Sequence, residues 1–317
     1  MKWYIRLFLF CFILFCLIQV LSILFMPNKS NLSQFGVYNK TKYELLSEEN
    51  DTIDVIFLGD SLIYSSIIPA HLYNKYGFTS FDCAEPAQTI DDTLKYLKIA
   101  IESQHPKVVF VESDVIFRNM DNKIRRKNYM NRELKNYFPI LKFHNNWKKI
   151  GQGQIVNPLK GYKINLKTKG IKKDVLRQKE KIKNSYNKSK IIKKNKQVMQ
   201  EIIDTCKKNN IKIILIDIIN YGTWSYERNN AVAEFAHKND IVFLDTNLTE
   251  YKKEIGIDWS RDTKDWGKHL NLSGAKKFSD FIGNYITGMN IVEDHRNDEK
   301  YSQWNKAYEF FLKKSLK

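Results

Sequence analysis

The hydrophobic pattern after residue 52 alternates between short apolar runs and longer amphipathic stretches. The runs are rich in β-branched residues, as is typical of strands, and they cover Ile53 to Leu58, Thr79 to Cys83, Val108 to Glu112, Ile211 to Ile216 and Ile241 to Asp245. Helical periodicity marks Ala70 to Lys75, Thr89 to Ser103, Lys188 to Lys208, Ser225 to Asn239 and Ser273 to Tyr285. Nearly continuous apolar strands separated by helices predict an α/β protein with a central parallel sheet covered on both faces.

The N-terminus carries an apolar run from Leu7 to Met26 that only two polar residues interrupt. A helix of that length spans roughly 30 Å, the thickness of the hydrocarbon core of a bilayer. Lys2 and Arg6 precede the run, which predicts a cytoplasmic N-terminus over residues 1–6 and an extracytoplasmic remainder. A cleaved signal peptide is the alternative, although no clear cleavage site follows the run. We expect a single-pass cell-membrane anchor over 7–26 and a polar linker over 27–52.

The net charge of +17 comes from one part of the chain. Residues 118–196 hold 25 Lys and Arg against 4 Asp and Glu, so this basic segment carries +21 and the rest of the chain −4. The segment is an insertion between the third and fourth predicted strands, and we expect it to be helical in part and to lie over the catalytic edge. It is either a solvated surface or a binding surface for lipid headgroups or an anionic wall polymer. Nucleic acid is excluded as a partner outside the cell.

The cysteine and metal-ligand patterns add little to the functional interpretation of the sequence. Only Cys83 and Cys206 lie in the exported part, and their spacing matches no zinc or redox motif, which leaves a single disulfide open. The sequence contains no metal-ligand cluster and no glycine-rich phosphate loop, so we expect neither a metal nor a cofactor. A weak helical pattern in the tail, 291–317, predicts one further helix that packs on the domain.

The first predicted strand ends in the sequence VIFLGDS, which places Ser61 directly after Gly59 and Asp60. In parallel α/β sheets, reactive residues collect at the carboxyl ends of the strands. Ser61 therefore has two interpretations. It is either the N-cap of the next helix or a nucleophile. A nucleophilic serine needs a base to take its proton.

The sequence DTKDWGKHLNLSG supplies a base near the other end of the chain. His269 follows a loop with two acids, Asp262 and Asp265, and precedes a predicted helix. An imidazole that activates a serine needs an acid on its second nitrogen, and this one loop offers both groups. We prefer Asp265 as the acid and keep Asp262 as the alternative.

These motifs resemble the SGNH/GDSL hydrolase superfamily, which has a flavodoxin-like three-layer fold. The N-terminal anchor, CAEPAQTI after the second strand and KHLNLSGAKKF near the end resemble an exported, membrane-anchored branch of it. That branch is akin to the D-alanyl-lipoteichoic acid biosynthesis protein and to alginate-type O-acetyltransferases. The resemblance covers an SGNH-like domain over 53–290, within which the basic segment is an insertion.

The resemblance implies roles for individual residues. It makes Ser61 the nucleophile, His269 the general base and the Ser61 N–H an oxyanion donor. Ala87 stands where the family usually has a glycine that donates its N–H. The asparagine of the third block is missing, because Glu112, Ser113 and Asp114 stand in its place, and Gln88 is a candidate replacement donor.

The implied function is an extracytoplasmic serine acyltransferase or esterase that acts on O-acyl groups of a cell-wall or surface polymer. It would work without a cofactor, through an acyl-enzyme, beside a multi-spanning membrane acyltransferase. A simple ester hydrolase is one alternative. A non-catalytic protein that keeps the fold as a binding scaffold is the other.

Overall fold

The computed structural model describes residues 2–24, 37–118, 127, 130, 134, 137–138, 140–143, 158–172 and 185–316. The chain forms two compact units. The first consists of residues 1–43 and 119–156, and the second of residues 44–118 and 157–317. The basic segment is therefore divided between the two units.

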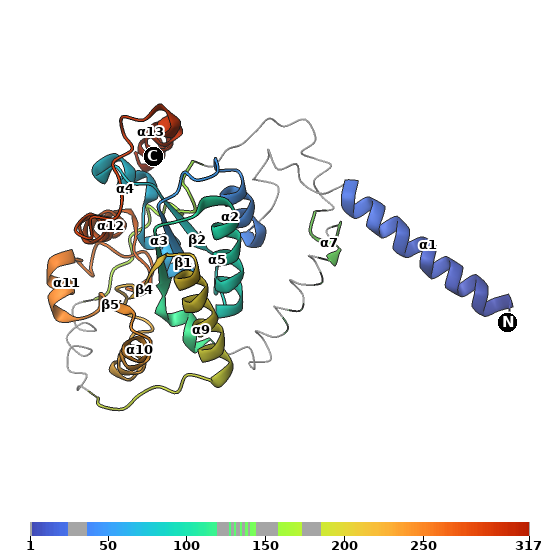
Figure 1. Cartoon of the computed structure of the whole chain (residues 1–317), viewed down its shortest axis with the longest axis horizontal. Helices are drawn as coiled ribbons and strands as arrows, with labels where there is room; N and C mark the ends of the chain where they lie inside the picture. The colour runs from blue at the N-terminus through green and yellow to red at the C-terminus, as the bar shows by residue number, and fades with distance from the viewer. Residues whose placement is uncertain are drawn as a thin grey trace. The chain divides into compact units, whose positions relative to one another are not determined.

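The second unit is built on a five-stranded parallel sheet (Figure 1). Its strands are β1 (Val55–Gly59), β2 (Ser80–Ala84), β3 (Val108–Glu112), β4 (Lys212–Asp217) and β5 (Val242–Asp245). The strand order is β2-β1-β3-β4-β5, and every neighbouring pair is parallel. This is the flavodoxin-like order of a doubly wound sheet, so the predicted fold class is confirmed. All five predicted strands are present, shifted by two residues or fewer.

Helices cover both faces of the sheet. One face holds α5 (Ile90–Gln104), α9 (Lys193–Lys208) and α10 (Tyr226–Lys238). The other holds α3 (Ser61–Ser66), α4 (Pro69–Tyr76), α11 (Thr249–Ile255) and α12 (Leu272–Thr287). Alternate residues of each strand enter the two cores, with Ile56 and Leu58 in the first and Val55 and Phe57 in the second.

The tail forms the predicted helix, α13 (Ser302–Ser315), after a short 3₁₀ turn, η4 (Glu299–Tyr301). The helix packs on α4, and its Trp304 is fully buried beside Tyr73. A hydrogen bond also holds the tail, because His295 Nε2 lies 2.7 Å from the buried carboxylate of Asp54. The tail is thus part of the second unit.

Several short elements in the described part of the chain fall outside the sequence prediction, among them α2 (Val37–Leu46), α3, α11 and the 3₁₀ turn η2 (Ser113–Phe117). The linker expected over 27–52 therefore contains a helix, and its Leu45 is buried in the core. The helix expected from Lys188 begins at Lys193. The unpredicted elements α2, α3, α11 and η2 have ten residues or fewer, which is too few turns for a clear periodic pattern.

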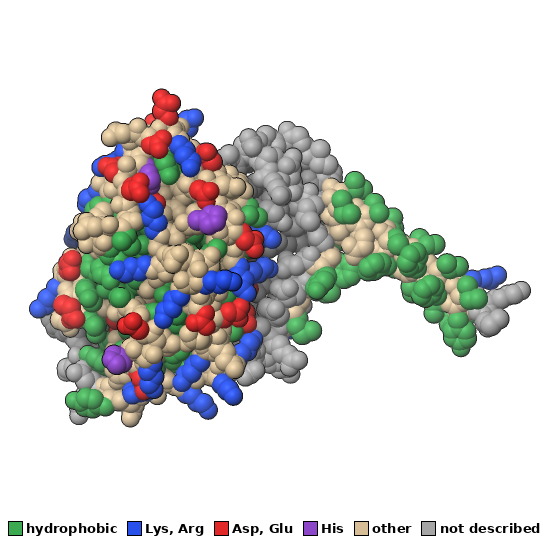
Figure 2. Space-filling view, viewed as in Figure 1, with side chains coloured by type: hydrophobic (Ala, Val, Ile, Leu, Met, Phe, Trp, Pro, Cys, Tyr) green, Lys and Arg blue, Asp and Glu red, His purple; other side chains and the backbone are tan. Residues whose placement is uncertain are grey.

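The first unit contains α1 (Lys2–Leu24) and the short α7 (Ile140–Phe143). Residues Trp3–Leu24 of α1 are long and apolar enough to cross a membrane. Figure 2 shows that the described surface of this helix is largely hydrophobic, with a blue, basic patch toward its N-terminal end. A helix that exposes so much apolar surface on all sides is suited to lipid and not to water.

Cys83 and Cys206 are both buried and both free, so they form no disulfide. Burial raises the pKa of the Cys206 thiol to about 12 and that of the Cys83 thiol well above its usual range. Both act as small apolar core residues.

Candidate active site

Ser61 lies at the carboxyl end of β1, as the first residue of α3. The preceding residue, Asp60, is the N-cap, because its Oδ1 accepts a hydrogen bond from the N–H of Leu62 at 2.8 Å. The hydroxyl of Ser61 is thereby free of the capping role. Its own N–H belongs to the first turn, where backbone donors have no acceptor within the helix.

Gly59 brings the strand close to its neighbours just before the serine. A Cβ at this position would lie 2.5 Å from Cβ of Glu112 and 2.7 Å from Cγ1 of Ile63, which leaves no room for a side chain. The glycine of the GDS sequence is therefore required by the close approach of β1, β3 and α3.

His269 joins the two distant sequence motifs. Its Nε2 lies 2.8 Å from Oγ of Ser61, and its Nδ1 lies 2.6 Å from Oδ2 of Asp265. The second oxygen of Asp265 accepts a hydrogen bond from the backbone N–H of His269 at 2.8 Å. The structure thus brings Ser61, His269 and Asp265 into a continuous hydrogen-bonded chain. Such a chain can move a proton from a serine hydroxyl to an imidazole whose tautomer the carboxylate fixes.

A tight turn between Asp265 and His269 makes this arrangement fit. Trp266 and Gly267 both have positive φ angles, of 58° and 86°. A Cβ on Gly267 would lie 2.3 Å from Cδ1 of Ile171, so only glycine fits there. The left-handed turn folds the loop back so that the acid four positions before the histidine reaches its ring.

Asp262, the alternative acid, has a structural role in the loop before α12. Its side chain is buried, and Oδ2 accepts hydrogen bonds from Nζ of Lys277 at 2.6 Å and from the N–H of Asp258 at 2.8 Å. Its carbonyl accepts the N–H of Asn271 at 3.0 Å. Asp262 therefore closes the loop at the start of α12 and does not meet the imidazole.

Ala87 has a φ of 52°, in the left-handed region that glycine favours. The backbone here follows the path that a glycine would take, although an alanine in this region is strained by roughly 1–2 kcal/mol. Ala87 follows β2 by three residues, so its N–H lies in the turn at the carboxyl edge of that strand.

Gln88 is not placed to act as a donor to a substrate, which corrects the sequence prediction. Its Oε1 accepts the N–H of Glu85 at 3.0 Å, and its Nε2 donates to the carbonyl of Cys83 at 3.3 Å and to Oγ1 of Thr93 at 3.2 Å. The side chain is almost fully buried. The physical reason is that its amide satisfies the backbone of the turn after β2, which would otherwise be buried without partners.

The site of the missing asparagine is a buried charge cluster. Glu112 at the end of β3 is fully buried, and burial together with nearby Asp114 and Asp60 raises its pKa well above the usual range. Its Oε1 accepts the N–H of Asp114 at 2.9 Å. Glu112 therefore shapes the end of β3, at a place where burial and the neighbouring carboxylates disfavour its charged form.

Arg118 is the residue that the sequence analysis missed. Its buried guanidinium donates to the carbonyl of Gln88 at 2.7 Å and to Oδ2 of Asp114 at 3.2 Å, and it forms an ion pair with Asp60. It thus ties the turns after β1, β2 and β3 together, and its partner Asp60 directly precedes Ser61. Its position as the first residue of the basic segment is the only sequence signal, and nothing separated it from the other cations there.

Residues 158–172 of the basic segment lie against both elements that carry the Ser61 and His269 side chains. The N–H of Lys163 donates to the carbonyl of Tyr64 in α3 at 2.9 Å. Lys169 exchanges backbone hydrogen bonds with the histidine loop, donating to the carbonyl of Thr263 at 2.9 Å and accepting from the N–H of Trp266 at 2.7 Å. This part of the insertion therefore lies at the edge of the sheet where Ser61 and His269 meet, and residues 158–172 contain no helix.

A half-buried lysine lies beside α3. Nζ of Lys264 is 3.1 Å from Oγ of Ser65, one turn after Ser61, and burial lowers the pKa of this ammonium group. The carboxylate of Asp265 partly opposes that shift. Lys264 therefore places its amino group on the C-terminal turn of α3.

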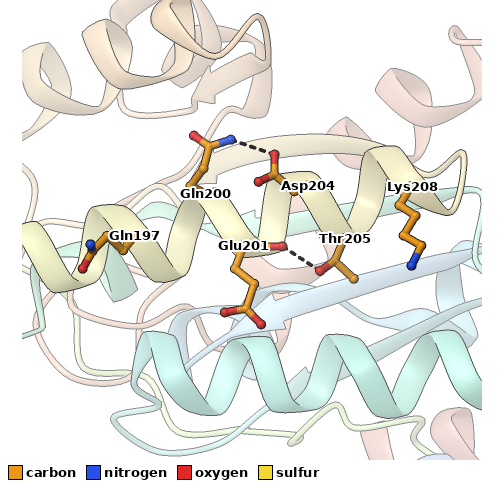
Figure 3. Close-up of a pocket in the computed structure, with 6 residues that line it drawn as sticks. All are labelled: Gln197, Gln200, Glu201, Asp204, Thr205 and Lys208. Carbon is orange, nitrogen blue, oxygen red and sulfur yellow. Dashed lines mark hydrogen bonds between the residues drawn. The ribbon is translucent and has the colours of Figure 1, made fainter.

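A surface depression of about 380 Å³ elsewhere has no link to these residues. All six residues that line it lie on α9 (Figure 3). Nε2 of Gln200 donates to Oδ1 of Asp204 at 2.9 Å, and Oγ1 of Thr205 donates to the carbonyl of Glu201 at 2.6 Å. It is a groove along one helix. Within the part of the chain that the structure describes, no group of acidic, histidine or cysteine side chains is arranged to hold a metal ion.

The second unit is thus an α/β protein with a serine, a histidine and an aspartate linked at the carboxyl edge of a parallel sheet. No protein-family model and no curated protein matches the chain. Several solved structures have a similar fold at low sequence identity.

One is a putative acylhydrolase from Bacteroides fragilis, 13% identical over 83% of this chain and 99% of that chain, with a TM-score of 0.39. A second is the esterase EstA from Pseudoalteromonas sp., 11% identical over 74% and 97%, with a TM-score of 0.41. A third is the lipase/acylhydrolase from Enterococcus faecalis, 13% identical over 76% and 98%, with a TM-score of 0.39. At these values the similarity says nothing about substrate, and the chemistry of the site follows from its own geometry.

Proposed function

We propose that this protein is a membrane-anchored serine acyltransferase or esterase that acts outside the cytoplasm on the O-acyl groups of a cell-wall or surface polymer. The observation that carries the proposal is the hydrogen-bonded chain from Ser61 through His269 to Asp265, with contacts of 2.8 and 2.6 Å. Both distances are within the range in which protons are transferred between side chains.

In the first half of the reaction, Nε2 of His269 takes the hydroxyl proton of Ser61 as Oγ bonds to the carbonyl carbon of an acyl donor. The carbonyl oxygen becomes negative and accepts hydrogen bonds from the N–H groups of Ser61 and Ala87. When the tetrahedral intermediate collapses, the bond to the leaving group breaks and His269 returns the proton to it. The product is an acyl ester on Ser61.

In the second half, His269 takes the proton of an acceptor hydroxyl, and the acceptor oxygen attacks the acyl carbon. The bond to Oγ of Ser61 breaks, and the proton passes back to Oγ. A polymer hydroxyl as acceptor gives transfer, and water gives hydrolysis. We put transfer first, because a protein held beside the membrane meets wall-bound and lipid-linked acceptors at a high local concentration.

The location of the acceptor rests on α1 and on charge. The apolar helix Trp3–Leu24, with Lys2 and Arg6 at its N-terminal end, favours a single-pass anchor with the second unit outside. The basic segment, 118–196, favours an anionic polymer or anionic lipid headgroups as neighbours. A multi-spanning membrane acyltransferase that supplies the acyl group is the partner we propose, and co-purification from the membrane tests it.

A serine-reactive fluorophosphonate probe tests the core of the proposal on the full-length protein in detergent micelles. We expect labelling of the native chain and none of Ser61→Ala, with peptide mapping to Ser61. The same two proteins are then incubated with an acyl donor and a wall polymer, and acylated polymer should form only with native protein. A well-folded native chain that stays unlabelled would support the non-catalytic scaffold instead.

A further inference from the structure

A cavity of about 440 Å³ lies at the carboxyl ends of β4 and β5 and belongs to none of the residues assigned above. Four aromatic residues line it, Tyr221, Trp224, Tyr226 and Trp259. Ligands of parallel α/β sheets bind outside this edge, and the volume is in the range of small-ligand sites. We refer to it as the aromatic pocket.

Buried amides hold the walls of the aromatic pocket in place. Oδ1 of Asn220 accepts the N–H groups of Gly222 and Thr223, both at 2.9 Å, and Oδ1 of Asn247 accepts the N–H of Asn220 at 2.9 Å. These amides are therefore used within the protein. The aromatic side chains that share this lining are therefore set before any ligand binds, beside polar groups of the same walls.

Trp224 is fixed in the same way. Its Nε1 donates to Oδ2 of Asp245 at 2.7 Å, and its ring packs edge-on against Tyr226 with the centroids 4.7 Å apart. Nζ of Lys252 lies 5.3 Å from the centroid of the Trp224 ring. The ammonium group of Lys252 therefore lies near the Trp224 ring, and the hydrogen bond to the buried carboxylate of Asp245 fixes the orientation of that ring.

The aromatic pocket adjoins the loop that carries His269. The N–H of Tyr221 donates to the carbonyl of Gly267 at 2.7 Å. A Cβ on Gly222 would lie 3.2 Å from Cγ of Lys268, the residue before the histidine. One side of the pocket and the turn between Asp265 and His269 are therefore in direct contact. An acceptor longer than one unit can place its reacting hydroxyl at Ser61 and a neighbouring unit in the pocket.

We propose that the aromatic pocket binds a sugar or polyol unit of the acceptor polymer, and that the unit carries an anionic substituent such as phosphate. The apolar C–H faces of such a unit pack on Trp224 and Tyr226, and the anion meets the cation of Lys252. This inference rests on the proposed function, because the polymer is the acceptor named there. It adds the class of unit that the protein recognises.

Calorimetric titration of a poly(glycerol phosphate) teichoic acid into the full-length Ser61→Ala protein tests the pocket without any turnover. We expect binding, and we expect Trp224→Ala in the same background to weaken it by about tenfold or more. Trp224→Phe keeps a ring and retains most of the affinity, which separates loss of the aromatic face from loss of the fold. Tyr186→Ala, at an exposed residue outside the pocket, is the matched control and leaves the affinity unaltered.

Equal affinity of the Trp224→Ala and parent proteins, or no binding of the polymer to either, would overturn the pocket assignment. A separate result, the absence of fluorophosphonate labelling at Ser61 in the native chain, would show that the proposed function is wrong. The two results are independent, because the titration does not need a reactive serine.

Discussion

Asp265 holds His269 by two contacts at once, one oxygen on the backbone N–H at 2.8 Å and the other on Nδ1 of the ring at 2.6 Å. The carboxylate thereby fixes both the position of the residue and the orientation of its imidazole. Nε2 is left to face Ser61. The turn through Trp266 and Gly267 is what allows an acid four positions away to do this.

The two acids of this loop should respond differently to the same change. Asp265→Asn replaces an acceptor on Nδ1 with a group that can favour the wrong tautomer, so we expect the rate of fluorophosphonate labelling to fall by about 10⁴-fold. Asp262→Asn alters only the side-chain contacts with Lys277 and with the N–H of Asp258, so the labelling rate should stay within a few-fold of the native value. Equal losses in both variants would mean that the assignment of the acid is wrong.

Arg118 should contribute more to the free energy of unfolding than an exposed lysine or arginine does. It is buried between Asp60 and Asp114, so Arg118→Gln leaves the buried carboxylate of Asp60 without its cation and Asp114 with Arg228 alone, and it should lower the free energy of unfolding by about 3–5 kcal/mol. Arg118→Lys should recover only part of this, since an ammonium cannot make the same set of planar contacts. Urea unfolding followed by circular dichroism measures the effect.

Arg261 provides the control for that experiment. Its side chain is exposed, and its Nε lies 3.8 Å from Asp258. Arg261→Gln should change the free energy of unfolding by about 0.5 kcal/mol or less, because exposed pairs contribute little. A similar small change at Arg118 would contradict the view that it ties the three turns together.

Ala87 offers a test of the backbone at the second turn. Ala87→Gly relieves the left-handed strain at φ 52° and should keep the stability within about 1 kcal/mol of the native chain, with labelling of Ser61 retained. Ala87→Val places a β-branched side chain in the same conformation and should lower both stability and labelling rate. Thermal unfolding and the rate of fluorophosphonate labelling are measured on the native chain and the two variants. Native stability and labelling rate in Ala87→Val would show that the φ angle at this position is not constrained.

Much of this fold is predictable from local pattern. The five strands are continuous apolar runs and the long helices have clear periodicity, so both are visible without tertiary information. The GDS sequence and the KHLNLSG sequence also predict Ser61 and His269 correctly as neighbours in space, because parallel strands and the helix-start loops share one edge of the sheet.

The rest depends on contacts that no local pattern records. The choice of Asp265 over Asp262 follows from two left-handed residues and the packing of Gly267 on Ile171. The role of Arg118 follows from partners on three separate turns. Gln88 was a reasonable donor by position, but buried backbone groups of its own turn take up its amide.

The carboxyl group of Asp82 on β2 leads to a prediction about pH. It is fully buried, and its two oxygens have no hydrogen-bond partner among the residues that the structure describes. Burial raises its pKa well above the usual range, although Lys163 acts in the opposite direction. Below the unfolded-state pKa of about 3.9 the group is protonated in both states. As pH rises above that value, the unfolded chain releases the proton and the folded chain retains it, so the folded state loses stability until the folded-state pKa is reached.

Asp82→Asn removes this titration while keeping the shape of the side chain. We expect the free energy of unfolding of the variant to be close to that of the native chain at about pH 4. At about pH 8 we expect it to be higher than that of the native chain by about 1 kcal/mol or more. Thermal unfolding across that pH range measures the difference. Asp204→Asn, at an exposed carboxylate of α9, is the matched control and should shift the melting temperature little at any pH. An advantage of Asp82→Asn that shrinks as pH rises would contradict the raised pKa, because the sign of the linkage would then be reversed.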